Sequence, residues 1–255
     1  MRLSITGSPP VEHEGLLRNI AHAESLDLPK AGLGRNKREG RLAVVGGGPS
    51  VPHHLARIRE ASEVWAINGA CAFLRNHGIE SVFFAVDPHP IVAKWAVGAS
   101  KALLCNRVDP EVFRVLKGAE IRLYGLEADG DGVKCGSSTA TVAFHLGVEQ
   151  GFTEIDFFGC ESSYDDATHA YNDEKREDEL VVECGGKRFR TAPDYYAQAQ
   201  EMAAIIRHFP KHFRHHGGGL LQAMIDHREF DVVWVSQSMA RGMTPIYEET
   251  TCQSS

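Results

Sequence analysis

A glycine-rich turn carries the strongest chemical signal in this sequence. It follows an apolar run at 42–45 and consists of Gly46, Gly47, Gly48, Pro49 and Ser50. Glycine has no Cβ, so a ligand can approach the backbone N–H groups of such a turn closely. Pro49 and Ser50 suit the start of a helix, whose N-terminus attracts anions, and the turn therefore predicts a cradle for a nucleotide phosphate. The alternative is a tight strand-to-helix turn without a ligand, because the spacing matches neither the dinucleotide fingerprint nor the P-loop.

A second turn of the same type precedes another predicted helix. It contains Gly136, Ser137 and Ser138 within the run Cys-Gly-Ser-Ser-Thr-Ala that ends at position 140. Its backbone N–H groups and serine hydroxyls could contact a phosphate or a sugar. Capping of the helix by one serine is the alternative, which leaves the other hydroxyl groups of the run unexplained.

Two polar side chains stand directly after predicted strands. Asn68 follows the run 63–67, and Asp87 follows the run 81–86. A carboxylate at the position of Asp87 could hold a divalent cation against phosphates or bond a ribose hydroxyl, so we predict a catalytic and Mg²⁺-binding role for it. Asn68 could bond a base or a phosphate. The structural alternatives are a helix cap for Asp87 and an ordinary Asn-Gly turn for Asn68.

A third group of candidates follows the predicted strand 154–158 and comprises Gly159, Glu161, Tyr164 and His169. Glu161 or His169 could assist an acceptor hydroxyl by taking its proton, since imidazole titrates near neutral pH. His169 lies in a densely charged segment, so a solvated surface position is the alternative for it. We predict that Gly159 and Tyr164 contact the nucleotide.

The basic residues Lys187, Arg188 and Arg190 lie close together near the C-terminal end of a predicted hairpin. They could neutralise the charge of a transferring phosphate. The alternative is that they form the exposed face of the hairpin, where basic side chains need no specific role.

Strands and helices alternate along the middle of the chain, which predicts an α/β, Rossmann-like fold with a mostly parallel sheet and helices on both faces. The predicted strands are 42–45, 63–67, 81–86, 101–105, 120–124 and 154–158. The predicted helices between them are 51–61, 70–77, 91–97, 110–116 and 137–150. Ligands of such sheets bind beyond the carboxyl ends of the strands. The candidate residues above all follow strands, so we expect them to converge at one edge.

Three regions are predicted along the chain. Residues 1–40 form a helical appendage with a helix at 11–26 and a linker at 31–40, and residues 41–165 form the nucleotide-binding core. Residues 166–255 contain a lid and a helix-strand extension that completes the domain. Within and just before this last region we predict a charged mobile loop at 165–179, a hairpin at 181–189, a helix at 194–209, a strand at 230–235 and a disordered tail at 250–255.

Composition limits the classes of function. The chain has 255 residues and a net charge of −7, and its pI is near 6.0, which argues against a broad nucleic-acid-binding surface. Membrane-length apolar runs and signal-peptide features are missing, so we expect a soluble cytoplasmic protein. The six cysteines form no C-x-x-C pair, and we expect most of them to be buried. The oligomeric state stays open, homo-oligomers included.

The order of these blocks resembles a known family. The segments Val44-Val-Gly-Gly-Gly-Pro-Ser50, Ala66-Ile-Asn-Gly-Ala70, Val86-Asp87, Gly136-Ser-Ser-Thr-Ala140 and 151–164 together resemble the 6-hydroxymethylpterin diphosphokinase MptE-like family. That family is Rossmann-like and common in bacteria, archaea and phages. Its archaeal namesake transfers diphosphate from ATP, with magnesium, to a pterin alcohol. The same blocks are also similar, more distantly, to bacterial sialyltransferases that use CMP-sialic acid.

The resemblance implies a nucleotide-dependent transferase that uses ATP with Mg²⁺ and a small-molecule acceptor with a hydroxymethyl-type group. The alternative enzyme is a glycosyltransferase with a nucleotide sugar as donor, which would need little or no metal. The alternative without catalysis is a nucleotide-binding module, because the sequence contains no unambiguous catalytic base. The identity of the acceptor cannot be obtained from the sequence.

Overall fold

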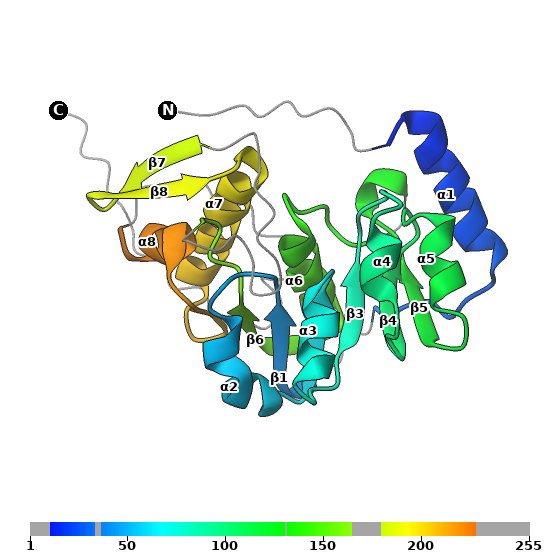
Figure 1. Ribbon diagram of the computed structural model, residues 1–255, viewed down its shortest axis with the longest axis horizontal. Helices are drawn as coiled ribbons and strands as arrows, with labels where there is room; N and C mark the ends of the chain where they lie inside the picture. The colour runs from blue at the N-terminus through cyan, green and yellow to red at the C-terminus, as the bar shows by residue number, and fades with distance from the viewer. Residues whose placement is uncertain (1–10, 34–36, 131, 165–179, 228–255) are drawn as a thin grey trace.

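The computed structural model describes residues 11–33, 37–130, 132–164 and 180–227, and within them a seven-stranded parallel sheet forms the centre of the molecule (Figure 1). The strands of this sheet are β1 (Arg38–Val45), β2 (Glu63–Ile67), β3 (Val82–Ala85), β4 (Lys101–Cys105), β5 (Glu120–Tyr124), β6 (Phe152–Phe158) and β9 (Phe213–His216). The α-helices are α1 (His13–Ser25), α2 (Leu55–Arg59), α3 (Ala70–Asn76), α4 (Val92–Ala96), α5 (Pro110–Val115), α6 (Thr139–Glu149), α7 (Pro193–His208) and α8 (Gly219–His227). The predicted α/β class with a mostly parallel sheet is therefore confirmed.

The order of the strands is β5-β4-β3-β2-β1-β6-β9. The chain builds outward from β1 as far as β5, then returns to place β6 on the other side of β1. The direction of winding therefore reverses between β1 and β6. In open α/β sheets such a switch point opens a crevice at the carboxyl ends of the two strands, where ligands bind.

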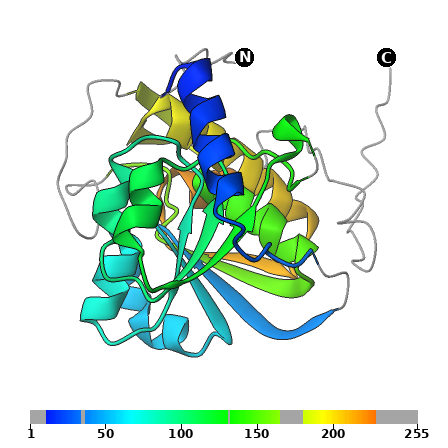
Figure 2. The same cartoon turned by 90° about the vertical axis from the view of Figure 1, so that its right-hand side faces the viewer.

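Helices cover both faces of the sheet. Turning the molecule shows α2 to α5 on one side of the strands and α6 with α7 on the other (Figure 2). This division has a topological cause. Crossovers between parallel strands are right-handed, so the connecting helices change face when the order of the strands reverses direction, as it does here at β1. α6 packs against β1, β2 and β6, and so lies directly over the switch point.

The core is formed by apolar strands that are buried on both faces. Trp65 stacks on Phe84 with 5.4 Å between ring centroids, and Phe84 stacks in turn on Tyr124 at 5.4 Å. The hydroxyl group of Tyr124 donates to the carbonyl oxygen of Ala85, and Nε1 of Trp65 donates to Oε1 of Glu63, so both polar atoms of this stack are paired. Fully buried aromatic side chains of this size each contribute on the order of 2–3 kcal/mol through burial alone.

A buried carboxylate joins the sheet to α2. Asp156 of β6 is fully buried, and its carboxylate oxygens lie 3.4 Å from Nε of Arg41, 3.5 Å from Nε of Arg57 and 3.7 Å from Nε of Arg214. Nε2 of His216 lies 3.0 Å from the same carboxylate. Burial favours the neutral acid, but His216 and the arginines outweigh it and lower the pKa of Asp156. This network ties β1, α2, β6 and β9 together.

The sequence predicted most of these elements. The strands at 63–67, 101–105 and 120–124 are observed with the predicted bounds, and the helix predicted at 11–26 is α1. The helix predicted at 51–61 is wrong in detail, because residues Val51–His54 form a 3₁₀ turn and only Leu55–Arg59 are α-helical. The linker predicted at 31–40 is also too long, because β1 begins at Arg38.

The C-terminal region adds a hairpin, two helices and one strand. The predicted hairpin is β7 (Leu180–Cys184) with β8 (Lys187–Thr191), and the predicted helix at 194–209 is α7. Strand β9 and helix α8 were not predicted, and β9 extends the central sheet next to β6. The predictions for 165–179, 230–235 and 250–255 lie outside the described residues.

Candidate functional site

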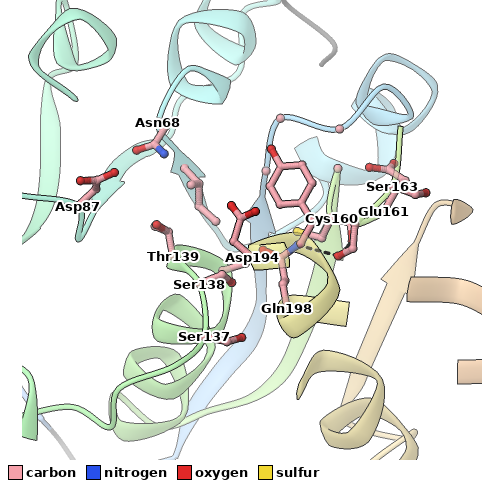
Figure 3. A pocket seen from close by; sticks show the side chains of 18 of the residues that line it. Asn68, Asp87, Ser137, Ser138, Thr139, Cys160, Glu161, Ser163, Asp194 and Gln198 are labelled. Atoms are coloured by element: carbon pink, nitrogen blue, oxygen red, sulfur yellow. Dashed lines mark hydrogen bonds between the residues drawn. The ribbon is translucent and has the colours of Figure 1, made fainter. Parts of the chain in front are cut away.

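A cavity of about 380 Å³ lies at the carboxyl ends of the central strands (Figure 3). It opens at the switch point between β1 and β6, as the topology predicts. Its lining comes from the segments that follow β1, β2, β3 and β6, from α4 and from the N-terminal parts of α6 and α7. The lining residues are Gly46, Gly47, Gly48, Ile67, Asn68, Asp87, Trp95, Ser137, Ser138, Thr139, Ala140, Gly159, Cys160, Glu161, Ser162, Ser163, Asp194, Tyr195 and Gln198.

The first glycine turn is packed tightly against the end of β6. The N–H of Gly46 donates to the carbonyl oxygen of Phe158 at 2.8 Å, and the N–H of Gly48 donates to that of Gly159 at 2.9 Å. A β-carbon on Gly48 would lie 1.6 Å from Oε2 of Glu161. Two of the three glycine amides are therefore bonded to the protein's own backbone, and the absence of a side chain at Gly48 makes room for Glu161.

Asn68 adopts a backbone conformation that few residues other than glycine accept. Its φ is +50°, and its Oδ1 is buried without a hydrogen-bond partner among the described residues. Strained backbone and unpaired polar atoms each cost about 1–3 kcal/mol, and both occur preferentially at functional sites. Asn68 therefore lies in the cavity with hydrogen-bonding capacity that the described part of the protein does not use.

Asp87 lies beyond the end of β3 and is partly exposed to the cavity. Its Oδ1 accepts the N–H of His89 at 2.8 Å, which closes a local turn. Asp87 does not cap the next helix, because α4 has Ile91 as its N-cap residue. Only one carboxylate oxygen takes part in the bond to His89, which leaves the other oxygen available. In Figure 3 Asp87 and Asn68 lie at the same end of the cavity, with Thr139 close to them.

The first turn of α6 faces the cavity with open backbone donors. Ser138 caps this helix, since its Oγ accepts the N–H of Thr141 at 3.3 Å while Oγ1 of Thr141 accepts the N–H of Ser138 at 3.0 Å. The preceding two amides, those of Thr139 and Ala140, cannot be bonded within the helix. Ser138 therefore caps the helix, as the alternative interpretation predicted. The N–H groups of Thr139 and Ala140 remain without a partner among the described residues.

A carboxylate of α7 fixes the turn that precedes α6. Oε2 of Glu201 accepts the N–H of Ser137 at 2.7 Å, and Nε2 of the buried His145 lies 3.4 Å from its Oε1. Burial raises the pKa of Glu201, but the bonds from His145 and Ser137 outweigh burial and hold that pKa below the usual value. The amide of Ser137 is therefore used within the protein, in contrast to those of Thr139 and Ala140.

The segment that follows β6 is anchored on several sides. Ser162 has a φ of +57°, and its Oγ accepts a hydrogen bond from Nε2 of Gln198 at 2.9 Å. Its carbonyl oxygen accepts the hydroxyl of Thr191 at 2.7 Å. Glu161, which is only 5% exposed, accepts the hydroxyl of Ser50 on Oε1. The position of the Glu161 carboxylate is thus fixed before any ligand binds.

The lining of the cavity is acidic. Asp87, Glu161 and Asp194 contribute carboxylates, whereas no lysine, arginine or histidine occurs among those lining residues that the structure describes. An anionic ligand would therefore depend on backbone amides and on a cation that it brings with it. The described residues contain no group of three histidine, cysteine or acidic side chains able to hold a metal ion by themselves.

The carboxylates and the unpaired amides of the cavity can be compared with the usual ligands of Mg²⁺. That ion is usually held by one or two carboxylates, with phosphates and waters as the remaining ligands. Asp87 offers one carboxylate oxygen beside the open amides of α6, so the residues present fit a Mg²⁺ ion that arrives with a nucleotide. They do not fit a permanently bound ion.

Several residues predicted for the site lie elsewhere or outside the described part. Pro49, Ser50, Gly136 and Tyr164 are not among the lining residues of the cavity. The ring of Tyr164 packs against that of Tyr195 with centroids 5.6 Å apart. His169 lies outside the described residues. The basic residues of the hairpin are exposed and do not line the cavity, in agreement with the structural alternative.

Sequence reasoning missed the contribution of α7. Asp194 and Gln198 lie one turn apart at the start of this helix, and both line the cavity together with Tyr195. The i, i+4 spacing of two polar residues could have identified a polar helix face. Only the packing of α7 against α6 and β9 shows that this face meets the cavity.

A comparison with protein families gives one match. The family described as 6-hydroxymethylpterin diphosphokinase MptE-like matches residues 14–167, which is more than half of the chain. The chain therefore belongs to this family, whose description names a transferase. A search of curated proteins gives no match. The more distant similarity to sialyltransferases is not supported. Among the described helices, none combines the length and apolar character that a membrane crossing requires.

Proposed function

We propose that this member of the MptE-like family is a nucleotide-dependent transferase that moves a diphosphate or phosphate group from ATP to a hydroxymethyl-type acceptor. The main support for the proposal is that two kinds of group line the same end of the cavity. These are the unpaired amides at the N-terminus of α6 and the carboxylate of Asp87. Amides that belong to a helix N-terminus attract phosphate oxygens. A carboxylate opposite them favours phosphates that carry a divalent cation.

The donor would occupy the end of the cavity that contains Asn68, Asp87 and Thr139. The phosphates would accept hydrogen bonds from the amides of Thr139 and Ala140, with the glycine turn beneath them. The Asn68 side chain would complete its hydrogen bonds with the nucleotide. Asp87 would hold Mg²⁺, which neutralises charge on the phosphates and so assists their transfer.

The acceptor would occupy the other end, between α7 and the segment after β6. Glu161 lies there, and Figure 3 places it across the cavity from Asp87, with Asp194 between the two. A carboxylate held in one position by Ser50 is suited to accept the proton of an acceptor hydroxyl as that oxygen attacks phosphorus. Glu161 would therefore serve as the general base, a role for which His169 was the other candidate.

Isothermal titration calorimetry with ATP and with CMP, each with and without Mg²⁺, tests the proposal. We expect ATP to bind with Mg²⁺ and to bind at least tenfold more weakly without it. Magnesium-independent binding of CMP with no binding of ATP would instead indicate a nucleotide-sugar transferase. ATP that binds tightly but stays intact through long incubation with candidate alcohols would indicate a binding module without catalysis.

A further inference from the structure

Helix α1 buries a polar side chain at the centre of its contact with the rest of the protein. The helix lies outside the sheet and packs beside α5 (Figure 1). Its buried residues are Gly15, Asn19 and Ala23, which lie four positions apart and therefore share one face. Leu17 of the same helix is 51% exposed, whereas Asn19 is only 6% exposed. The contact face of α1 thus consists of small residues around one buried amide.

The side-chain amide of Asn19 joins two loops at the carboxyl edge of the sheet. Its Nδ2 donates to the carbonyl oxygen of Arg107 at 3.0 Å and to that of Pro88 at 3.3 Å. Pro88 follows β3, and Arg107 follows the neighbouring strand β4. An asparagine amide has two N–H donors, so both are used here. Asn19 therefore connects α1 to the loop that contains Asp87.

The bond to Pro88 reaches the Asp87 carboxylate through a single peptide group. The carbonyl of Pro88 and the N–H of His89 belong to the same planar unit. That N–H donates to Oδ1 of Asp87 at 2.8 Å. Asn19, the peptide group and the carboxylate thus form one chain of hydrogen bonds, in which each bond polarises the next. Because Oδ1 is held by this peptide group, the other oxygen of Asp87 is the one available to a cation.

Few other hydrogen bonds restrain this peptide group. Two of the four residues at 88–91 are prolines, which have no N–H to donate. The N–H of Ile91 donates to Nδ1 of His89 at 3.1 Å, which is a local bond. Within the part of the chain that the structure describes, the bond from Asn19 is the only hydrogen bond that joins 88–91 to a distant segment. Without it the peptide plane is free to rotate, and the bonded carboxylate rotates with it.

We propose that Asn19 is a positioning residue for the cation that accompanies the nucleotide. By fixing the peptide group between Pro88 and His89, it holds the Asp87 carboxylate in the orientation that binds Mg²⁺ beside the open amides of α6. The inference rests on the proposed function, since Asp87 is the magnesium ligand named there. Removing the hydrogen-bond partner of a metal ligand typically weakens metal binding 10–100-fold. Asn19 acts through one intervening peptide group, so we expect the lower limit of about tenfold.

Amide hydrogen exchange measured by NMR tests the chain of hydrogen bonds without any ligand. We expect Asn19→Ala to speed the exchange of the His89 amide about fivefold or more, because the peptide group opens more often. His22→Ala is the matched control and should leave that exchange unchanged. The ring of His22 packs against that of Phe113 with centroids 5.7 Å apart, and no described hydrogen bond joins His22 to the loop. Unchanged exchange in Asn19→Ala, or equal acceleration in both variants, would overturn the proposal.

Calorimetry separates the positioning role from general damage to the fold. Asn19→Ala should bind ATP about tenfold more weakly in Mg²⁺ but nearly as well as the natural protein without Mg²⁺, because the amides of α6 do not depend on Asn19. In the Asp87→Asn background the same substitution should have no further effect. Equal losses with and without Mg²⁺, or a full loss in the Asp87→Asn background, would overturn the proposal. If the natural protein binds no ATP, the proposed function fails, while the exchange rates still decide whether Asn19 fixes the peptide group that holds Asp87.

Discussion

Two carboxylates at opposite ends of the cavity carry different chemistry at the scale of single residues. Asp87 is partly exposed and keeps one oxygen outside its turn bond, which suits a cation. Glu161 is buried and held by Ser50, which suits a proton acceptor of fixed position. The two proposed roles differ because the two carboxylates differ in exposure and in hydrogen bonding.

Replacing Asp87 by asparagine should remove the magnesium dependence of ATP binding. The amide still accepts the N–H of His89 but no longer attracts a cation, so ATP affinity in Mg²⁺ should fall about tenfold or more, which corresponds to roughly 1.4 kcal/mol. Calorimetry measures this change. Asp109→Asn is the matched control, because Asp109 accepts the N–H of Glu111 at 2.8 Å in the same way but does not line the cavity. Equal losses in the two variants would contradict the role of Asp87.

Replacing Gly48 by alanine should disturb the site and the fold together. The new β-carbon would lie 1.6 Å from Oε2 of Glu161 and 2.8 Å from the carbonyl carbon of Gly159, so both must move. Overpacking of this kind costs about 1–3 kcal/mol. Urea unfolding measures the loss, and Gly32→Ala, which would meet nothing within 4 Å, serves as the control. An unchanged unfolding midpoint for Gly48→Ala would show that the turn is looser than described.

At the scale of elements, α6 is the helix whose N-terminus is best placed to bind the proposed phosphate. Its eleven residues begin at the cavity, and Ser138 and Thr141 satisfy the cap without using the first two helical amides. The 3₁₀ turn and the five-residue α2 after the glycine turn are too short to contribute a comparable helix dipole. The sequence predicted phosphate binding at both glycine turns, and the unpaired amides make the second turn the stronger candidate.

Replacing Thr139 by proline should weaken ATP binding while the helix remains. Proline is well tolerated at the first helical position and removes one N–H donor. The extended conformation of Ser138, with φ −154° and ψ 168°, is also compatible with a following proline. Loss of one bond to a charged group predicts a tenfold or greater fall in ATP affinity. Thr139→Ala retains the amide and should bind ATP nearly as the natural protein does. Circular dichroism verifies that both variants fold.

The parts of the fold that could be predicted are those set by local pattern. Apolar runs that end at turn residues gave β2, β4 and β5 with their observed bounds. Strand β9 could not be predicted in this way, because Phe213-Arg-His-His contains one apolar residue and is placed by its pairing with β6. The same holds for the site. Asn68 and Asp87 follow strands and were found, whereas the positions of Asp194 and Gln198 depend on tertiary packing.

At the scale of the whole molecule, buried ionisable groups make stability depend on pH. Burial lowers the pKa of His215 to about 4 in the folded chain, whereas that pKa is about 6.5 when the chain is unfolded. Between these values the unfolded chain binds a proton that the folded chain does not, so stability is complete above pH 6.5 and falls as the pH drops toward 4. Asp156 and Glu201, whose pKa values are lowered, add a further loss only below their unfolded values near 4.

Urea unfolding of the natural chain and of His215→Gln between pH 7 and pH 4.5 should separate these contributions. The His215 contribution predicts a slope of up to about 1.4 kcal/mol per pH unit below pH 6.5, and the variant should lack that slope. If the stability of the variant still depends on pH near pH 5, that dependence comes from other groups. One of them is His54, because burial also lowers its pKa. Identical slopes for the two proteins would contradict the buried, neutral state of His215.

The central claim is that one end of this cavity holds the phosphates of a nucleotide. A crystal structure of the chain with Mg²⁺ and a non-hydrolysable ATP analogue tests it most directly. The account predicts phosphate oxygens within about 3 Å of the amide nitrogens of Thr139 and Ala140, with the metal ion bound to Asp87. A nucleotide bound elsewhere, or a cavity that stays closed by the protein's own side chains at saturating ligand, would contradict it.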